Sequence, residues 1–186
     1  MIKNKKSIFF PPGGILIWII LFVEMITFFM GIVSLLYEKR HAHSDFMIMQ
    51  SSLNLPFGLW NTFFLITSGF FMANAVNFHK KFQKKGVTIS LLLAICFGVF
   101  FLILKSIEYL GKWNAGFTIN FNDFFTYYWL LTGFHFLHVF VGLLIMIYMY
   151  LIRNRILHEN LESGATFWHM CDLIWIILFP ALYLVG

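Results

Sequence analysis

Five long apolar stretches divide this chain of 186 residues, and each is long enough to cross a lipid bilayer as a helix. The hydrocarbon core of a bilayer is about 30 Å thick, which roughly 20 apolar residues span in helical form. The stretches are continuous rather than alternating in apolar and polar residues, which favours helices over the strands of a membrane barrel. The predicted fold is therefore an all-α, polytopic membrane protein. Its single domain, residues 1–186, is a bundle of five transmembrane helices at about 15–37, 56–78, 87–110, 127–152 and 165–186.

The composition excludes an ordinary soluble domain. Of the residues, 60% are hydrophobic and only 11% are charged, whereas soluble domains have about 45–50% apolar and about 25% charged residues. The net charge is +5, but the basic residues lie between the apolar stretches and form no stripe with interleaved aromatic residues. Nucleic-acid binding is therefore not expected. Cys96 and Cys171 lie inside apolar stretches without a CxxC pattern, and we predict that both are small buried hydrophobic residues.

The lysine and arginine residues outside the apolar stretches predict the orientation in the membrane. Three lie in the N-terminal tail, four in the loop after the second stretch and two in the loop after the fourth, which makes nine on one side against three on the other. Because basic residues concentrate in cytoplasmic loops, the N-terminus is predicted to be cytoplasmic and the C-terminus to be outside. The first stretch carries Glu24 and precedes no small-x-small cleavage site, so we expect a retained helix.

Each stretch also carries small or polar residues three or four positions apart, which share one face of a helix. A charged side chain at the centre of a bilayer costs on the order of 2.5–3.5 kcal/mol unless it pairs or is neutralised. Glu24 lies near mid-bilayer, and we expect it to stay protonated or to hydrogen-bond to the last helix. Lys105 and Glu108 lie one turn apart, which predicts an ion pair within their helix. Asn61 and Ser68 lie on the polar face of the second helix.

The polar side chains of the last two stretches allow two interpretations. His135, His138, His169 and Asp172 could ligate a metal, or His135 and His169 could clamp a haem. A bis-histidine haem site needs histidines at matching depths on facing helices, however, and His135 lies nearer the outer side than His169. We therefore favour hydrogen-bonded structural histidines and assign no catalytic, cofactor-binding or metal-binding residue.

Motifs in several stretches resemble the signatures of a known family. Residues 132–139 read TGFHFLHV and resemble the TGFHGLHV signature of cytochrome oxidase subunit III. Residues 168–172 read WHMCD and resemble the WHFVD motif in the last helix of that family. Residues 61–69 resemble its N…L..SG pattern. The resemblance covers nearly the whole chain from Pro12 onward, with the motifs in the same order and on the corresponding helices.

Three features depart from the usual pattern of this family. Phe136 stands where glycine is usual, and Lys105 stands where a glutamine usually precedes a Glu-Tyr pair. Family members commonly have seven helices, and this chain matches the last five. Its length and its ending, residues 178–183, look closest to a short branch that includes the E-type subunit associated with nitric-oxide reductases.

The resemblance implies a non-catalytic subunit III-like component of a haem–copper terminal oxidase of the cytochrome c oxidase type. This complex would belong to the aerobic respiratory electron transport chain of a bacterial cytoplasmic membrane. The implied partners are the catalytic subunit I, the other oxidase subunits and membrane phospholipids; haem and copper would lie in the partner, and none would be bound directly. The chain would stabilise the catalytic subunit. A buried polar network would support lipid binding and proton uptake, formed by Glu24, His135, His138, His169 and Asp172.

Other functions remain as alternatives. The close one is an accessory subunit associated with a nitric-oxide reductase, which shares the fold and differs in the complex served. More distant ones are a free-standing membrane cytochrome and a proton-coupled transporter that uses Glu24 and Asp172 as a relay. A haem–copper catalytic site needs six histidines, and only three lie inside the apolar stretches. A transporter would be expected to show inverted repeats with broken helices, and the sequence shows none.

Overall fold

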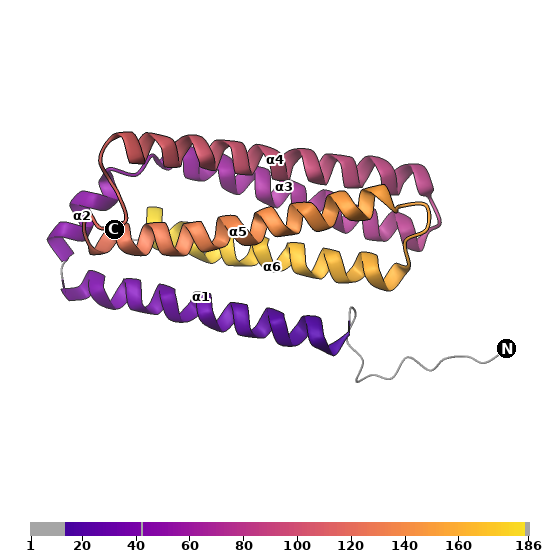
Figure 1. Cartoon of the computed structure of the whole chain (residues 1–186), viewed down its shortest axis with the longest axis horizontal. Helices are drawn as coiled ribbons and strands as arrows, with labels where there is room; N and C mark the ends of the chain where they lie inside the picture. Colours follow the sequence, from indigo (N-terminus) through magenta and orange to yellow (C-terminus); the bar gives the residue numbers. More distant parts are fainter. Residues whose placement is uncertain (1–13, 42, 185–186) are drawn as a thin grey trace.

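Figure 1 shows the computed structural model of the chain, which describes residues 14–41 and 43–184. In these ranges the chain forms six helices and no strand. A short helix, α2 (His43–Ser51), follows the first long one. The five others are long and apolar enough to cross a membrane, which confirms the predicted all-α bundle: α1 (Ile15–His41), α3 (Leu55–Lys80), α4 (Lys84–Asn114), α5 (Asp123–Leu151) and α6 (His158–Tyr183).

The helices extend beyond the predicted apolar stretches at several ends. α1 continues to His41 rather than ending at residue 37, and α6 begins at His158 rather than at residue 165. Hydropathy marks only the part of a helix inside the hydrocarbon core, whereas the helix itself continues into the headgroup region, where its polar side chains reach water. The predicted topology also used Lys3, Lys5 and Lys6, which lie outside the described residues, as do the last two residues of the predicted fifth span.

α6 is the central helix of the bundle. It packs against α1, α3 and α5, while α4 closes the other side by packing against α3 and α5. Its two tryptophans, Trp168 and Trp175, are 0% and 1% exposed and fill the space between the helices. α1 lies along α5 and α6 and is the least buried of the five long helices (Figure 1). The core therefore lies between α3, α4, α5 and α6, and α1 covers one side of it.

A glycine on α5 sets how closely that helix approaches α6. A Cβ atom added at Gly142 would lie 2.8 Å from Cε3 of Trp168, which is closer than real side chains pack. Small residues at such crossings allow membrane helices to approach and gain van der Waals contact. A Cβ atom added at Gly133, on the same helix, would meet no heavy atom within 4 Å. A larger residue at position 142 would therefore collide with Trp168, whereas one at position 133 would meet no neighbouring side chain.

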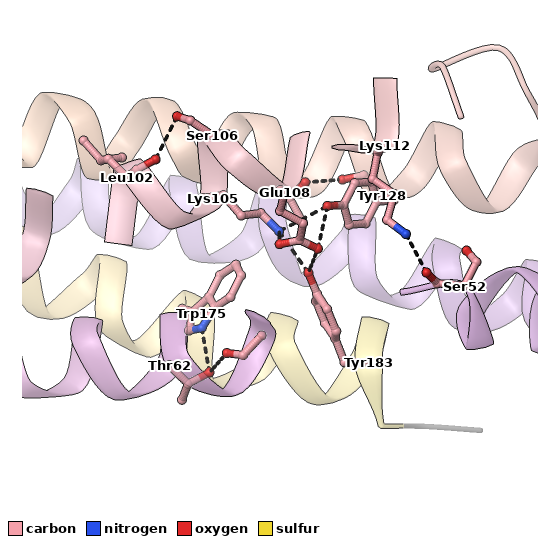
Figure 2. A network of polar contacts seen from close by, with 12 residues as sticks. Ser52, Thr62, Leu102, Lys105, Ser106, Glu108, Lys112, Tyr128, Trp175 and Tyr183 are labelled. Atoms are coloured by element: carbon pink, nitrogen blue, oxygen red, sulfur yellow. Dashed lines mark hydrogen bonds and ion pairs between the residues drawn. The ribbon is translucent and has the colours of Figure 1, made fainter. Parts of the chain in front are cut away.

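One end of the bundle, which we call the α2 end because α2 lies there, holds a buried ion pair (Figure 2). Lys105 Nζ lies 3.0 Å from Glu108 Oε2, and the two side chains are 1% and 2% exposed. The predicted pairing within α4 is thereby confirmed. A buried pair is stable only when its remaining donors and acceptors are also satisfied.

Two tyrosines from neighbouring helices satisfy the remaining groups of this ion pair (Figure 2). Tyr128 of α5 and Tyr183 of α6 donate to Glu108 Oε1 at 3.0 and 2.6 Å. Their hydroxyl oxygens accept from Lys105 Nζ at 3.3 and 3.0 Å. The three N–H donors of the lysine thus meet three acceptors, and each hydroxyl both donates and accepts. This closed cluster carries no net charge and joins α4, α5 and α6.

We expect replacement of Gly142 by alanine to destabilise the bundle. The added methyl group must displace the indole ring of Trp168, and overpacking of this kind typically costs about 1–3 kcal/mol. Gly133→Ala is the matched control, because it adds the same methyl group to the same helix without a neighbour and improves helix propensity by up to about 1 kcal/mol. Thermal unfolding in detergent measures the difference; equal midpoints for the two variants would contradict the packing described above.

We also expect strong coupling between Lys105 and Glu108. Glu108→Leu leaves a buried ammonium group without its counter-charge, which typically costs about 3–5 kcal/mol. Lys105→Met leaves the buried carboxylate of Glu108 without its counter-charge and should destabilise the protein by a similar amount. The double variant removes both charges, so it should be less destabilised than either single variant. Unfolding midpoints of the four proteins form a double-mutant cycle. Simple additivity of the two single effects would argue against a closed cluster.

Candidate functional site

Glu24 of α1 pairs with a histidine of α5 in the membrane-spanning part of the bundle. Its Oε2 atom lies 3.2 Å from His138 Nε2, and the two side chains are 23% and 14% exposed. The sequence predicted that Glu24 stays protonated or hydrogen-bonds to the last helix, α6; of these two alternatives, the partner on α6 is wrong, because the partner lies on α5. Residue spacing shows which face of α1 is polar but not which neighbouring helix that face meets, and the polar face of α1 meets α5 here.

A hydrogen bond within α5 orients the ring of His138. The carbonyl oxygen of Phe134 lies 2.8 Å from His138 Nδ1 and can only accept, so Nδ1 donates to it. Nε2 is thereby directed toward the carboxyl group of Glu24. An acid and a base side by side avoid the penalty for an isolated charge in hydrocarbon.

An apolar groove lies next to this pair, between α1 and α5. It has a volume of about 210 Å³, and Glu24 and His138 line it together with apolar side chains. Those side chains are Ile20, Leu137, Val141 and Phe167. The Glu24–His138 pair is therefore at the edge of a surface that hydrocarbon chains can cover, and it is not sealed inside the core.

A second acid–imidazole pair lies on α6. His169 Nδ1 is 3.2 Å from Asp172 Oδ2, one turn away, and the histidine side chain is 44% exposed. Asp172 itself is only 9% exposed and lies against Gly69 of α3. A side chain at residue 69 would collide with the carboxyl group, so glycine is needed there for α3 and α6 to pack around it.

His135 belongs to neither pair. It is 0% exposed and stacks on Trp175 at 5.2 Å, with the edges of Phe101 and Phe28 at 5.9 and 6.2 Å. Neither ring nitrogen has a hydrogen-bond partner among the described residues, so the hydrogen bond that we predicted for this histidine is not found there. Three residues of helix correspond to about 300°, so His135 lies only about 60° around α5 from His138. It still touches Phe28 of α1, but its ring lies in the aromatic core against Trp175 and Phe101.

The five residues that we predicted to form one network are therefore two separate pairs and an isolated imidazole. No hydrogen bond between the described residues joins the Glu24–His138 pair to the His169–Asp172 pair. Of the residues predicted on α3, Ser68 donates to the carbonyl oxygen of Ala94 at 2.6 Å. The amide of Asn61 is fully buried, and neither of its polar atoms has a partner in residues 14–41 and 43–184.

The sequence reasoning missed a histidine cluster at the end of the bundle opposite α2. His79 of α3 and His158 of α6 approach through their Nδ1 atoms at 3.2 Å. Glu162 Oε1 lies 3.0 Å from His158 Nε2 and 2.9 Å from Lys80 Nζ. The predicted start of the last helix at residue 165 hid this cluster, because it placed His158 and Glu162 in a loop.

The side chains that could ligate a metal are spread over several helices in the described part of the chain. No group of three His, Cys, Asp or Glu side chains there is arranged to hold a metal ion. Cys171 is buried as predicted, whereas Cys96 is exposed, so the prediction was wrong for that residue. Cys96 lies on the outward face of α4, where a small hydrophobic side chain is as stable against lipid as in a core.

Known proteins resemble this chain along most of its length. It matches the family Cytochrome c oxidase subunit III over residues 8–186. Cytochrome c oxidase subunit 3 of Mycosarcoma maydis is 33% identical over 135 residues, which cover 69% of this chain and 47% of that protein. The protein of the same name from Equus caballus is 30% identical over 133 residues, with 69% and 50% covered. The protein of the same name from Spodoptera frugiperda is 32% identical over 134 residues, which cover 69% of this chain and 88% of that protein.

The chain thus spans about half the length of the first of these curated relatives. The family match nevertheless includes every described residue, and with it all five membrane-spanning helices. The motifs around the histidines of α5 and α6 lie in the same range, which agrees with the resemblance seen in the sequence. The chain belongs to the cytochrome c oxidase subunit III family.

Proposed function

We propose that this chain is a non-catalytic subunit of a haem–copper terminal oxidase in the aerobic respiratory chain. In this role it stabilises the catalytic subunit, which holds the haem and copper, and supports proton uptake and phospholipid binding beside it. The observation that carries the proposal is the family match over residues 8–186 of a chain whose acids at membrane depth pair with bases rather than gather into a metal centre.

The surroundings of the histidines support a role without a bound cofactor. Both ring nitrogens of His138 lie against oxygen atoms, Nδ1 against the carbonyl group of Phe134 and Nε2 against the carboxyl group of Glu24. His135 is 0% exposed and is enclosed by the rings of Trp175, Phe101 and Phe28.

The basic residues support a cytoplasmic location for the end opposite α2 in a bacterial cytoplasmic membrane, and hence for the N-terminus. Lys81, Lys84 and Lys85 are exposed there, where they can meet anionic headgroups. At the α2 end, by contrast, Lys112 Nζ donates to the carbonyl oxygen of Ser52 at 2.5 Å, and Lys39 Nζ donates to Gln50 at 2.9 Å. Those two charges are held by the protein itself.

The Glu24–His138 pair supports the part of the proposal that concerns protons and lipid. The pair lies at the edge of an apolar groove, where a phospholipid acyl chain fits the lining. In the proposed role the two groups share one proton, which can move between carboxyl and imidazole without creating an isolated charge. Glu24 is a positioning residue in this scheme, because the reacting atoms of the oxidase lie in another subunit.

Purification of this chain from native membranes tests the assignment. We expect a large haem–copper subunit to accompany it, identified by mass spectrometry, and we expect the complex to consume oxygen. The complex should show a Soret band, and after separation this band should remain with the partner and be absent from this chain. A chain that purifies without a companion and keeps its own Soret band would contradict the proposal, and a partner that reduces nitric oxide but not oxygen would replace the oxidase by a reductase.

Two variants at residue 24 separate a proton role from a packing role. Glu24→Gln can still donate a hydrogen bond to neutral His138 but has no titrating proton, whereas Glu24→Ala loses both. We expect both complexes to assemble and both to lose activity faster than the native complex during sustained turnover. If the glutamine variant keeps the native activity lifetime while the alanine variant does not, Glu24 acts only through its hydrogen bond.

A further inference from the structure

The turn between α3 and α4 holds a phenylalanine in an unfavourable backbone conformation. Phe82 has a φ of 57° and is the only residue other than glycine with a positive φ in the described part of the chain. Its N–H group donates to the carbonyl oxygen of His79, and that of Gln83 donates to the carbonyl oxygen of Phe78, both at 3.0 Å. These two bonds end α3 in a Schellman motif, whose left-handed position is usually glycine. A side chain at residue 82 therefore adds backbone strain that glycine would avoid.

The ring of Phe82 contributes almost nothing to the packing of the bundle. It is 92% exposed, whereas the next most exposed large hydrophobic side chain among the described residues, Leu16, is 71% exposed. Strained backbone conformations cluster where a protein binds a ligand or changes its state. Packing within the chain does not require this ring, so the ring is available to a molecule outside the chain.

Three lysines of the same turn have no acidic partner. Lys81, Lys84 and Lys85 are exposed, and none of them forms an ion pair within residues 14–41 and 43–184. The fourth lysine of the turn, Lys80, is instead paired with Glu162 at 2.9 Å. The turn thus presents one apolar ring among three positive charges that the chain does not neutralise. Such a surface favours a ligand that combines a negative charge with an apolar part.

A small hollow beside the ring is lined by hydrogen-bond donors. Its volume is about 100 Å³, and Phe82, Gln83, Lys84 and Asn154 are among the residues that line it. The ammonium group and the two side-chain amides all have N–H groups to donate, and the lining contains no acidic residue. The hollow has room for more than a single water molecule. It therefore suits an anionic oxygen group such as phosphate.

The turn, at the end of the bundle opposite α2 (Figure 1), lies at the depth of lipid headgroups. α3 has 26 residues, which make a helix of about 39 Å. The hydrocarbon core is about 30 Å thick, and the bilayer with its headgroups about 40–45 Å. The apolar stretch of α3 ends at Phe78, so Phe82 lies about one turn farther out. From there its ring reaches the boundary between headgroups and acyl chains, while the lysines reach the phosphates.

We propose that the turn between α3 and α4 is a binding site for an anionic phospholipid. The ring of Phe82 inserts at the boundary between headgroups and acyl chains, and Lys81, Lys84 and Lys85 hold the phosphate. The site is separate from the groove beside Glu24. It goes beyond the proposed function, because it does not depend on which complex the chain serves, and it assigns a ligand to a strained residue that the fold does not use.

A glycine at residue 82 separates backbone strain from lipid binding. Without lipid, we expect Phe82→Gly to raise the unfolding midpoint of the purified chain in neutral detergent by about 2–4 °C, because the strain is relieved. Added phosphatidylglycerol should stabilise the native chain more than the variant, since a ligand of the folded state raises the midpoint. Phosphatidylcholine, which has no net charge, and inorganic phosphate should raise neither midpoint.

Three results of this experiment would overturn the proposal. A variant that unfolds below the native chain without lipid would mean that the ring packs within the protein. A variant that phosphatidylglycerol stabilises as strongly as the native chain would mean that the ring does not contact lipid. Equal stabilisation by inorganic phosphate would mean that the turn binds a soluble anion rather than a lipid.

A charge variant with a matched control tests the lysines. Lys84→Gln removes a charge from the lining of the hollow, whereas Arg155→Gln removes one from an exposed residue of the loop between α5 and α6 that does not line it. Native mass spectrometry of the purified chain counts bound phosphatidylglycerol. We expect Lys84→Gln to weaken binding about fivefold, the effect of one lysine at an anionic membrane surface, and Arg155→Gln to bind as the native chain does. Equal losses would indicate unspecific attraction and would contradict a defined site.

Photo-cross-linking in native membranes distinguishes a lipid from a protein partner. Phe82 is replaced by p-benzoylphenylalanine, and the same replacement at Phe140, on the exposed face of α5, is the control. We expect the adducts of position 82 to be enriched in anionic phospholipid relative to the membrane, and those of position 140 to follow the membrane composition. An adduct of position 82 with another polypeptide, or no enrichment, would overturn the proposal and leave the proposed function untouched.

Discussion

Hydrocarbon offers no water to satisfy a polar atom, and this constraint determines how the polar side chains of the bundle are arranged. Acids at membrane depth lie beside bases, such as Glu108 beside Lys105 and Glu24 beside His138. The lysine–glutamate cluster joins three helices at the α2 end. The second pair joins α1 to α5. Because these two combinations span different helices, satisfying the polar atoms also holds the helices in place.

Local features of the fold and site were predictable from the sequence, and long-range ones were not. Continuous apolar stretches predicted the five membrane helices, and an i, i+3 spacing predicted the Lys105–Glu108 pair, because both depend on neighbours along the chain. The partner of Glu24 depends on which helix lies beside α1, and no spacing within a helix contains that information. The same limit explains why His135, His138, His169 and Asp172 were expected in one network although they face different neighbours.

Residues that were missed could have been found from their depth. Tyr128 lies near the start of α5 and Tyr183 at the end of α6, so both lie at the same end of the bundle as Glu108, near the end of α4. A buried ion pair has donors left over, and tyrosines at matching depth are natural partners for them. His158 was missed for another reason. The apolar stretch begins at residue 165, where the hydrocarbon core begins, but α6 already begins at His158, outside that core.

The polar atoms that remain without partners in the described chain differ in where they lie. Asn61 and His135 are 0% exposed and enclosed by the core, so nothing from outside the chain can reach them without opening the bundle. Asp172 Oδ1 is as poorly hydrated, but its carboxyl group forms the floor of a groove open to the membrane. Packing alone therefore holds these atoms in place, whereas each described carboxyl group at membrane depth has a basic partner.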